Sequence, residues 1–182
     1  MKHSDTHRKL VEACKRHDRQ AQFKLYGLYS KAMYNICLRM LNNVGEAEDI
    51  LQNSFIDVFS KLDSFRYKSS IGAWIKRIVV NNCINHLKKR RIELVPLKQY
   101  EKATDEEQPE VAYSHLNVEK IKTAVQKLPD GYRVVLTLYL FEGYDHAEIA
   151  EIMNISVSTS KSQYNRAKKR LRGLMSEFQM SE

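Results

Sequence analysis

Apolar residues recur every three or four positions along most of the chain, which is the period of amphipathic helices. The first half holds four such runs, at 10–19, 21–41, about 43–62 and 71 to about 91. A second, smaller periodic block follows after residue 113. Neither block shows the alternation or the tight hairpin turns that are typical of strands. The pattern therefore predicts an all-α fold made of two small helical domains.

The stretch between the two blocks loses this periodicity and contains Pro96 and Pro109. From 101 to 110 it holds five acids against one lysine, a composition typical of a flexible acidic linker. We therefore expect an N-terminal domain of residues 1–92, a linker of 93–113 and a C-terminal domain of 114–182.

The C-terminal block has the pattern of two helices joined by a tight turn. Asp145 and Glu148 can form a capping box at the start of the first helix. Asn154 tolerates the left-handed turn conformation, and Ser156 can cap the second helix. From 159 to 172 that helix carries six positive charges and no acid. We expect a helix-turn-helix that binds DNA, with a solvated basic helix as the alternative.

The first block leaves more than one interpretation open. The run at 21–41, which includes Phe23, is apolar around most of its surface, so we expect a central helix. The next helix has a polar face that is either solvated or a partner surface. The loop at 63–70, DSFRYKSS, can stack unpaired bases and bind phosphate, or its aromatics can simply cover the core. Lys and Arg at 88–91 suit phosphate contact but also compensate the helix dipole.

Charge supports a nucleic-acid partner and limits the other classes. The chain has 30 Lys and Arg against 22 Asp and Glu, a net charge of +8, which attracts polyanions. Cys14, Cys37 and Cys83 form no CxxC pair, so we expect buried thiols in a reducing cytoplasm and no metal site. No apolar run is long enough for a membrane span or a signal core, so membrane insertion is not expected.

Four segments in a fixed order are more specific than any single motif. They are AEDILQNSFIDVFSKLDSF, WIKRIVVNN, LPDGYRVVLTLYLFEGYDHAEIAEIM and TSKSQYNRAKKRL. In this order and separation, the chain from about Phe23 to Leu174 resembles bacterial sigma factors, and most closely the extracytoplasmic-function (ECF) class of the sigma-70 family. The resemblance implies a two-domain factor that binds core RNA polymerase, places it on promoter DNA and helps to open the duplex. We expect no enzymatic activity, no catalytic residue and no cofactor.

The resemblance also implies three surfaces. The segment 47–62 matches the helix that docks on core polymerase, and its implied contact residues are Glu48, Asp49, Gln52, Asn53 and Phe55. The loop 63–70 and the helix after it match the parts that capture and melt the minus-ten element, with implied residues Phe65, Tyr67, Lys68, Trp74, Lys76, Arg77, Asn81, Asn82, Asn85, Lys88 and Lys89. The minus-thirty-five element would be read from the major groove by Ser158, Thr159, Lys161, Ser162, Asn165, Arg166, Lys168 and Lys169.

Further expectations follow from the same resemblance. The acidic linker is similar to the segment that threads through polymerase toward the RNA exit path. Many members of the family are held inactive by an anti-sigma factor, so such a partner is expected. Some positions depart from the family: Asn85 and Lys88 stand where Asp and Arg are common, and Ser160 and Gln163 replace a usual Val and Arg. We expect Ser160 and Gln163 to face the bases and therefore to affect promoter choice.

Two other classes of function fit the sequence less well. A stand-alone helix-turn-helix regulator explains the C-terminal block equally well, but it leaves the helix at 47–62 and the aromatic loop without a role. A metal-dependent enzyme would need Glu46, Glu48 and Asp49 to converge, and on one helical turn these side chains point in different directions.

Overall fold

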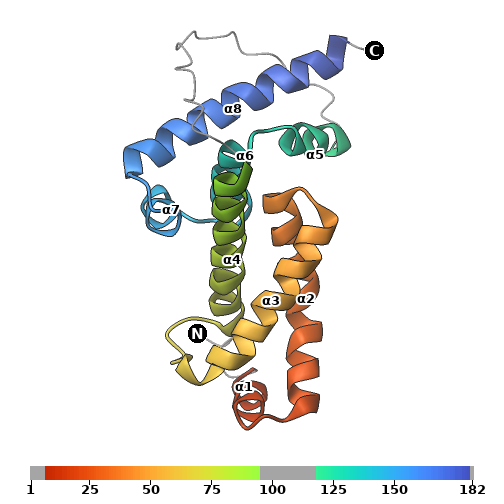
Figure 1. Cartoon of the computed structure of the whole chain (residues 1–182), viewed down its shortest axis with the longest axis vertical. Coiled ribbons are helices and arrows are strands. Elements are labelled where there is room, and N and C mark those ends of the chain that lie inside the picture. Colours follow the sequence, from red (N-terminus) through yellow and green to blue (C-terminus); the bar gives the residue numbers. More distant parts are fainter. Residues whose placement is uncertain (1–6, 95–117, 181–182) are drawn as a thin grey trace. The chain divides into compact units, whose positions relative to one another are not determined.

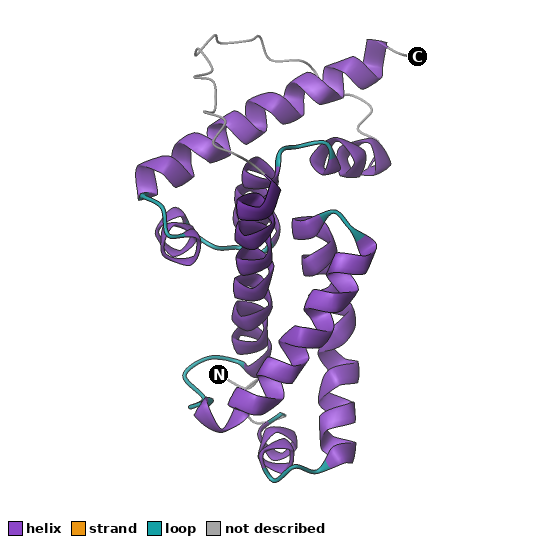
Figure 2. Ribbon diagram, in the orientation of Figure 1, coloured by secondary structure: helices purple, strands orange, loops and turns teal. Residues whose placement is uncertain are grey.

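The computed structural model describes residues 7–94 and 118–180, and every regular element in these two ranges is a helix (Figure 1, Figure 2). The all-α prediction is confirmed. The chain divides into two compact units, residues 1–87 and 88–182. The predicted linker at 93–113 lies outside the described residues except for its first two positions, where the preceding helix continues.

The N-terminal unit is built from three helices, a short 3-10 turn and most of a fourth helix. These are α1 (Arg8–Lys15), α2 (Arg19–Leu41), α3 (Val44–Lys61), η1 (Leu62–Ser64) and α4 (Ile71–Leu94). α2 packs along α3, and α1 packs against α2. The largest side chains sealed inside this unit are Leu25, Met40, Leu41, Leu62, Ile75, Val11, Val58 and Val79.

The first helix is shorter than the apolar pattern predicts. The pattern suggests one helix over 10–19, but α1 ends at Lys15. The carboxylate of Asp18 accepts hydrogen bonds from the N–H groups of Gln20 at 2.9 Å and Ala21 at 3.0 Å. Because a capping Asp satisfies the free amides of a new helix, it begins α2 where periodicity alone would continue α1.

The expectation that α2 is central holds for its second half only. Met33 and Met40 are buried there, but Phe23 is 80% exposed near the start. Ala21 and Leu25 take the inner face of the first turns, and Phe23 lies two residues from each. Two residues correspond to about 200° around a helix, so Phe23 points away from the core.

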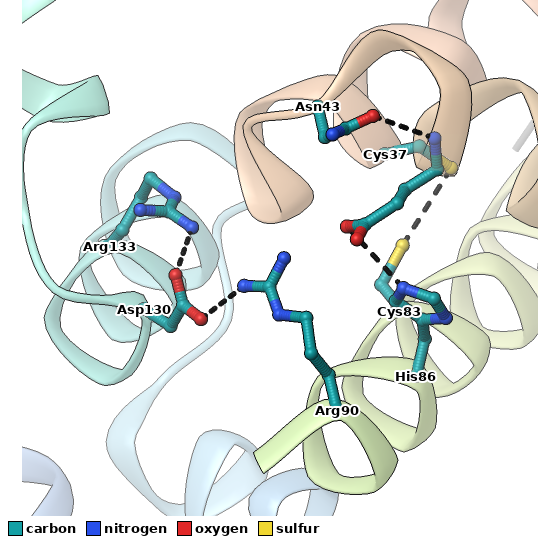
Figure 3. A network of polar contacts seen from close by, with 8 residues as sticks. Cys37, Asn43, Cys83, His86, Arg90, Asp130 and Arg133 are labelled. Atoms are coloured by element: carbon teal, nitrogen blue, oxygen red, sulfur yellow. Dashed lines mark hydrogen bonds and ion pairs between the residues drawn. The ribbon is translucent and has the colours of Figure 1, made fainter. Parts of the chain in front are cut away.

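The turn between α2 and α3 uses two asparagines. Asn42 adopts a left-handed φ of 55°, and the side chain of Asn43 accepts a hydrogen bond from the Glu46 N–H at 3.0 Å. The Asn43 side chain therefore caps the start of α3. The Glu46 carboxylate lies 3.4 Å from Nε2 of His86 on α4 (Figure 3). This contact ties the start of α3 to α4.

Two cysteines meet inside this unit. The Sγ atoms of Cys37 on α2 and Cys83 on α4 lie 3.7 Å apart, and both residues are fully buried (Figure 3). The neighbouring Cys37 thiol and burial raise the pKa of Cys83. Cys14 is also buried, and burial raises its pKa as well. All three cysteines thus serve as small core residues, as predicted.

The C-terminal unit packs four helices and a π-helical turn around a second core. Its elements are α5 (Val118–Gln126), α6 (Asp130–Leu136), η2 (Thr137–Phe141), α7 (His146–Met153) and α8 (Val157–Met180). The core cluster joins α5 and α6 to α8 through Ala124, Val125, Leu128, Leu136, Ala167, Leu174 and Met175. The buried guanidinium of Arg133 donates to the Leu128 carbonyl at 2.7 Å and pairs with the Asp130 carboxylate, which fixes the start of α6 (Figure 3).

Candidate functional site

The predicted helix-turn-helix is present as α7 and α8, and hydrogen bonds define both ends of its first helix. Asp145 accepts from the N–H groups of Ala147 and Glu148, and the Glu148 carboxylate accepts from the Asp145 N–H at 2.9 Å. This is the complete capping box. Asn154 ends the helix with a left-handed φ of 56°. The predicted capping box and left-handed turn are both confirmed.

A cluster of hydroxyl groups begins α8. The Ser156 hydroxyl accepts a hydrogen bond from the Thr159 N–H at 3.0 Å, as a helix cap does. It also lies 2.8 Å from the Ser158 hydroxyl and 2.7 Å from the Thr159 hydroxyl. The first turn therefore presents hydroxyls that are already ordered by one another, next to the positive end of the helix dipole.

The exposed face of α8 carries most of the predicted minus-thirty-five residues. Ser158, Lys161, Ser162 and Asn165 are exposed and follow a spacing of three or four residues, so they share one face. Arg166 is exposed beside them, whereas Thr159, Lys168 and Lys169 are half-buried, and the Lys168 ammonium lies 4.7 Å from the centre of the Tyr164 ring. This surface combines hydroxyl, amide and cationic groups, which suit base edges and phosphates.

The expectation that Ser160 and Gln163 face the bases is corrected for Ser160. Its side chain is fully buried, and its hydroxyl lies 2.9 Å from Nδ1 of His146 on α7. Gln163 is half-buried. The reason is geometric: residues 160, 163, 164 and 167 follow the inner stripe of α8, on which Ala167 is fully buried. The departure at Ser160 therefore concerns the packing of α8 against α7 rather than the exposed side of α8.

Three rings support this inner side, and sequence reasoning missed them. The ring of His146 stacks on Tyr139 at 4.6 Å between centroids, and Tyr164 lies 4.5 Å from Tyr139. They come from α7, η2 and α8 in turn. No short spacing in the sequence joins these positions, because the contact depends on how the three elements pack.

The predicted polymerase-binding residues of α3 divide into two groups. Glu48, Asp49, Gln52 and Asn53 are exposed, but Phe55 is only 3% exposed. Its ring packs edge-on against Tyr26 at 4.7 Å and lies 6.1 Å from Phe59. Phe55 therefore supports the surface from within. Ile56, which the sequence reasoning did not single out, is 67% exposed on the same helix.

The loop at 63–70 turns its aromatic rings inward. Phe65 is 3% exposed and packs against Tyr67 at 4.8 Å and Trp74 at 5.4 Å between centroids. Tyr67 and Trp74 are half-buried, and Lys68 is exposed. Of the two interpretations left open for this loop, the structure favours the one in which Phe65 covers the core. Tyr67 and Trp74 each keep part of their surface exposed.

On α4 the predicted residues also separate by face. Arg77, Asn81 and Asn85 are exposed at four-residue intervals, and Lys88 and Lys89 are exposed further along. Lys76 is half-buried. An amide and cation stripe of this kind can follow a DNA strand.

Asn82 behaves differently from its neighbours. It is half-buried, and its amide donates hydrogen bonds to the Ser54 hydroxyl at 3.1 Å and the Asp57 carboxylate at 3.0 Å. The hydrogen bond from Asn82 is the largest cause of a lowered pKa of Asp57. The hydrogen bond and the charge of Lys61 lower it further. Asn82 therefore joins α4 to α3, and its amide N–H groups are directed away from the exposed stripe.

Comparison of the sequence with known proteins identifies the family of each half of the chain. The family description "Sigma-70 region 2" matches residues 25–92, and "Sigma-70, region 4" matches residues 119–171. The ECF RNA polymerase sigma factor SigW of Bacillus subtilis is 32% identical over 176 residues, covering 91% of this chain and 94% of SigW. The RNA polymerase sigma-H factor of Pseudomonas aeruginosa is 31% identical, covering 87% and 88%.

Solved structures show the same fold. The sigma factor RpoE of Bartonella quintana, in complex with the anti-sigma factor NepR, matches with a TM-score of 0.58 at 23% identity, covering 84% of this chain and 95% of that one. CnrH, in complex with the cytosolic domain of CnrY, matches with a TM-score of 0.58 at 20% identity, covering 95% and 99%.

A helical fold with a capped helix-turn-helix is typical of DNA-binding transcription factors. The chain belongs to the sigma-70 family, in its ECF class of RNA polymerase sigma factors, which direct promoter-specific initiation. Among the helices that the structure describes, none is both long and apolar enough to cross a membrane.

Proposed function

We propose that this sigma factor contacts polymerase and promoter through three separate helix surfaces and has no catalytic activity of its own. The exposed polar side of α3, with Glu48, Asp49, Gln52 and Asn53, would bind core polymerase. We leave Phe55 out of this contact surface because its ring is buried. Its proposed role is to hold the surface in shape.

The exposed stripe of α4 would contact the minus-ten element. Asn81 and Asn85 offer amides to base edges, and Arg77, Lys88 and Lys89 offer charge to phosphates. Lys88 would act as a point charge, because an ammonium cannot form the bidentate fork of an arginine. The loop would add the outer edges of Tyr67 and Trp74, with Lys68 beside them.

The exposed face of α8 is the observation that best supports the proposed binding to promoter DNA. Ser158, Lys161, Ser162 and Asn165 share one face directly after a turn that is fixed by caps on both sides. This is the arrangement with which a recognition helix enters the major groove, its first turns toward the bases. Separate minus-ten and minus-thirty-five surfaces suit a factor that needs polymerase to hold both at once.

The partners of this proposal are core polymerase, promoter DNA and an anti-sigma factor. The last is included because the related RpoE structure contains one. The acidic segment at 93–113, nearly all of which lies outside the described residues, is proposed to enter polymerase along the RNA path. The setting we propose is the cytoplasm.

Transcription with purified components tests the proposal. The full chain is combined with core polymerase, the holoenzyme selects fragments from genomic DNA, and run-off transcription is measured on the recovered fragments. We expect discrete transcripts that need both the chain and core. DNA binding by the chain without any capture of core polymerase would instead indicate a stand-alone regulator. Failure to initiate on any selected fragment would overturn the proposal.

A further inference from the structure

Tyr67 adopts an unfavourable backbone conformation in the loop that follows η1. Its φ is 58°, in the left-handed region. For a bulky side chain this conformation costs roughly 1–2 kcal/mol, and it persists only where surrounding contacts determine it. The contacts that hold Tyr67 are therefore informative about what the loop must do.

Those contacts come from α1. The Tyr67 hydroxyl donates a hydrogen bond to the Glu12 carboxylate across 55 residues of sequence. The Arg8 guanidinium lies 5.1 Å from the centre of the Tyr67 ring, and the Lys15 ammonium lies 5.0 Å from it. Cations at this distance are attracted to the face of an aromatic ring. Three residues of one short helix thus surround a single side chain of the loop.

A second bond holds the backbone of the loop. The Lys15 ammonium donates to the Phe65 carbonyl at 3.2 Å and lies 3.5 Å from the Glu12 carboxylate. Lys15 has only 17% of its side chain exposed, so these bonds are partly shielded from water. Two points of the loop, the Phe65 carbonyl and the Tyr67 side chain, are fixed by the same helix.

The pKa shifts of Glu12 and Tyr67 agree with this geometry. The hydrogen bond from Tyr67 lowers the pKa of Glu12, with Lys15 and Arg8 acting in the same direction. Burial, together with Glu12, raises the pKa of Tyr67 to about 12. At neutral pH the carboxylate is charged and the phenol keeps its proton, so the hydrogen bond has a charged acceptor and is of the stronger kind.

A small cavity lies beside these contacts. Its volume is about 40 Å³, and its walls include Arg8, Tyr29, Phe65 and Tyr67 together with His7 at the start of α1. A space of this size holds a few water molecules but not a nucleobase. The side of the loop that faces α1 therefore offers no pocket for a base.

We propose that α1 is a positioning element for the minus-ten loop, and that Glu12, through Tyr67, sets the loop in the conformation that receives the promoter strand. Glu12 and Lys15 act through other residues and need not touch DNA. The inference rests on the proposed contact between this loop and the minus-ten element. α1 lies before the segment that matches region 2, which begins at residue 25.

Binding of single-stranded minus-ten DNA by holoenzyme tests this role. The probe is the non-template strand of a promoter selected by the wild-type holoenzyme. The variants are Glu12→Ala, Tyr67→Phe and the double variant, and each keeps the rest of the loop. We expect each single variant to bind the strand roughly tenfold more weakly, as the loss of a charge-assisted hydrogen bond predicts. The double variant should be no weaker than either single one, because both changes remove the same bond.

Matched controls separate positioning from loss of folding. Glu119→Gln removes a carboxylate from an exposed pair with Lys122 on α5, far along the chain, and should leave strand binding unchanged. Glu12→Gln keeps a neutral acceptor atom and should restore part of the affinity. All measurements are made well below the melting temperature, and affinity for core polymerase should stay the same. A purely structural role would lower both affinities together.

The outcomes distinguish this inference from the proposed function. If the wild-type holoenzyme initiates transcription and binds the strand, but Glu12→Ala binds it as well or more tightly, α1 does not position the loop. If the two single changes add fully, Glu12 and Tyr67 act separately and the inference is wrong. If the wild-type holoenzyme itself fails to bind any selected strand, the proposed function fails first.

Discussion

Nδ1 of His146 lies 2.9 Å from the hydroxyl oxygen of Ser160, so a hydrogen bond joins the two helices of the helix-turn-helix from the inside. Ser160 is fully buried, and the His146 ring contacts the rings of both Tyr139 and Tyr164. The angle between α7 and α8 thus depends on a polar contact within an aromatic cluster. A buried polar contact of this kind is costly to break from one side only.

Replacing Ser160 should change stability and leave promoter choice intact. Ser160→Ala removes the hydroxyl from a buried site, and we expect the free energy of unfolding to fall by about 1 kcal/mol. Thermal melting checks the stability, and selection of promoter DNA by the variant holoenzyme checks the sequence preference. Ser162→Ala, two residues away on the exposed face, is the matched control and should show the reverse pattern. An altered preference for Ser160→Ala at normal stability would contradict the buried role.

Substitutions of Asn165 and Arg166 should show whether each side chain reads a base or contacts phosphate. Both are exposed on the face of α8 that we propose to enter the groove. If either side chain reads a base, its change to Ala should reduce discrimination at one position of the upstream element by ~1–3 kcal/mol. Binding to a panel of singly substituted promoter duplexes measures this. Equal weakening on every duplex would show that the residue contacts phosphate instead.

The helix-turn-helix was predictable because its signals are local. The capping box of Asp145 and Glu148 and the left-handed Asn154 depend on neighbours within a few residues, and the structure has all of them. The charges of α8 were equally visible in the sequence. The inward direction of Ser160 was not predictable, since it depends on which stripe of α8 meets α7. The family resemblance alone places Ser160 toward the bases.

In the N-terminal unit, too, contacts between distant residues could not be predicted from the sequence. Phe65 and Tyr67 look like base-stacking residues when the loop is read alone, but their rings pack against Trp74 and α1. The contact between Tyr67 and Glu12 spans 55 positions, and no periodic pattern connects them. Asn81 and Asn82 are neighbouring asparagines that the sequence alone does not distinguish. Packing shows that Asn81 is exposed and that Asn82 joins α4 to α3.

Asn82→Ala and Asn81→Ala should therefore have different effects. Loss of the Asn82 amide leaves Ser54 and Asp57 without their bond to α4, and we expect about 1–2 kcal/mol lower stability. Asn81→Ala should leave stability within ±0.5 kcal/mol and weaken minus-ten binding. Urea unfolding followed by the fluorescence of Trp74, the single tryptophan, reports on this unit directly. Equal stability of the two variants would contradict the assignment.

The same bond predicts a dependence on acid. The pKa of Asp57 is lowered in the folded protein, chiefly by Asn82 and then by Lys61. A lowered carboxyl pKa contributes stability that is present above about pH 4 and is lost as the pH falls through the folded value. Asn82→Ala should therefore lose less stability than wild type on acidification below about pH 4. Unfolding measured from neutral pH down to pH 3 tests this, and parallel curves for the two proteins would show that Asn82 does not set the pKa of Asp57.

Substitution of Phe55 should affect the stability of the N-terminal unit, whereas substitution of Gln52 should affect binding to core polymerase. Phe55 is 3% exposed against Tyr26 and Phe59, so Phe55→Ala should destabilise the N-terminal unit by about 3–5 kcal/mol. Gln52 is exposed one turn earlier, and Gln52→Ala should leave unfolding unchanged while weakening binding to core polymerase. Urea unfolding and a titration of labelled protein with core polymerase measure the two effects. If Phe55→Ala weakened polymerase binding and remained as stable as wild type, its ring would belong to the contact surface, and the inward placement of Phe55 would be wrong.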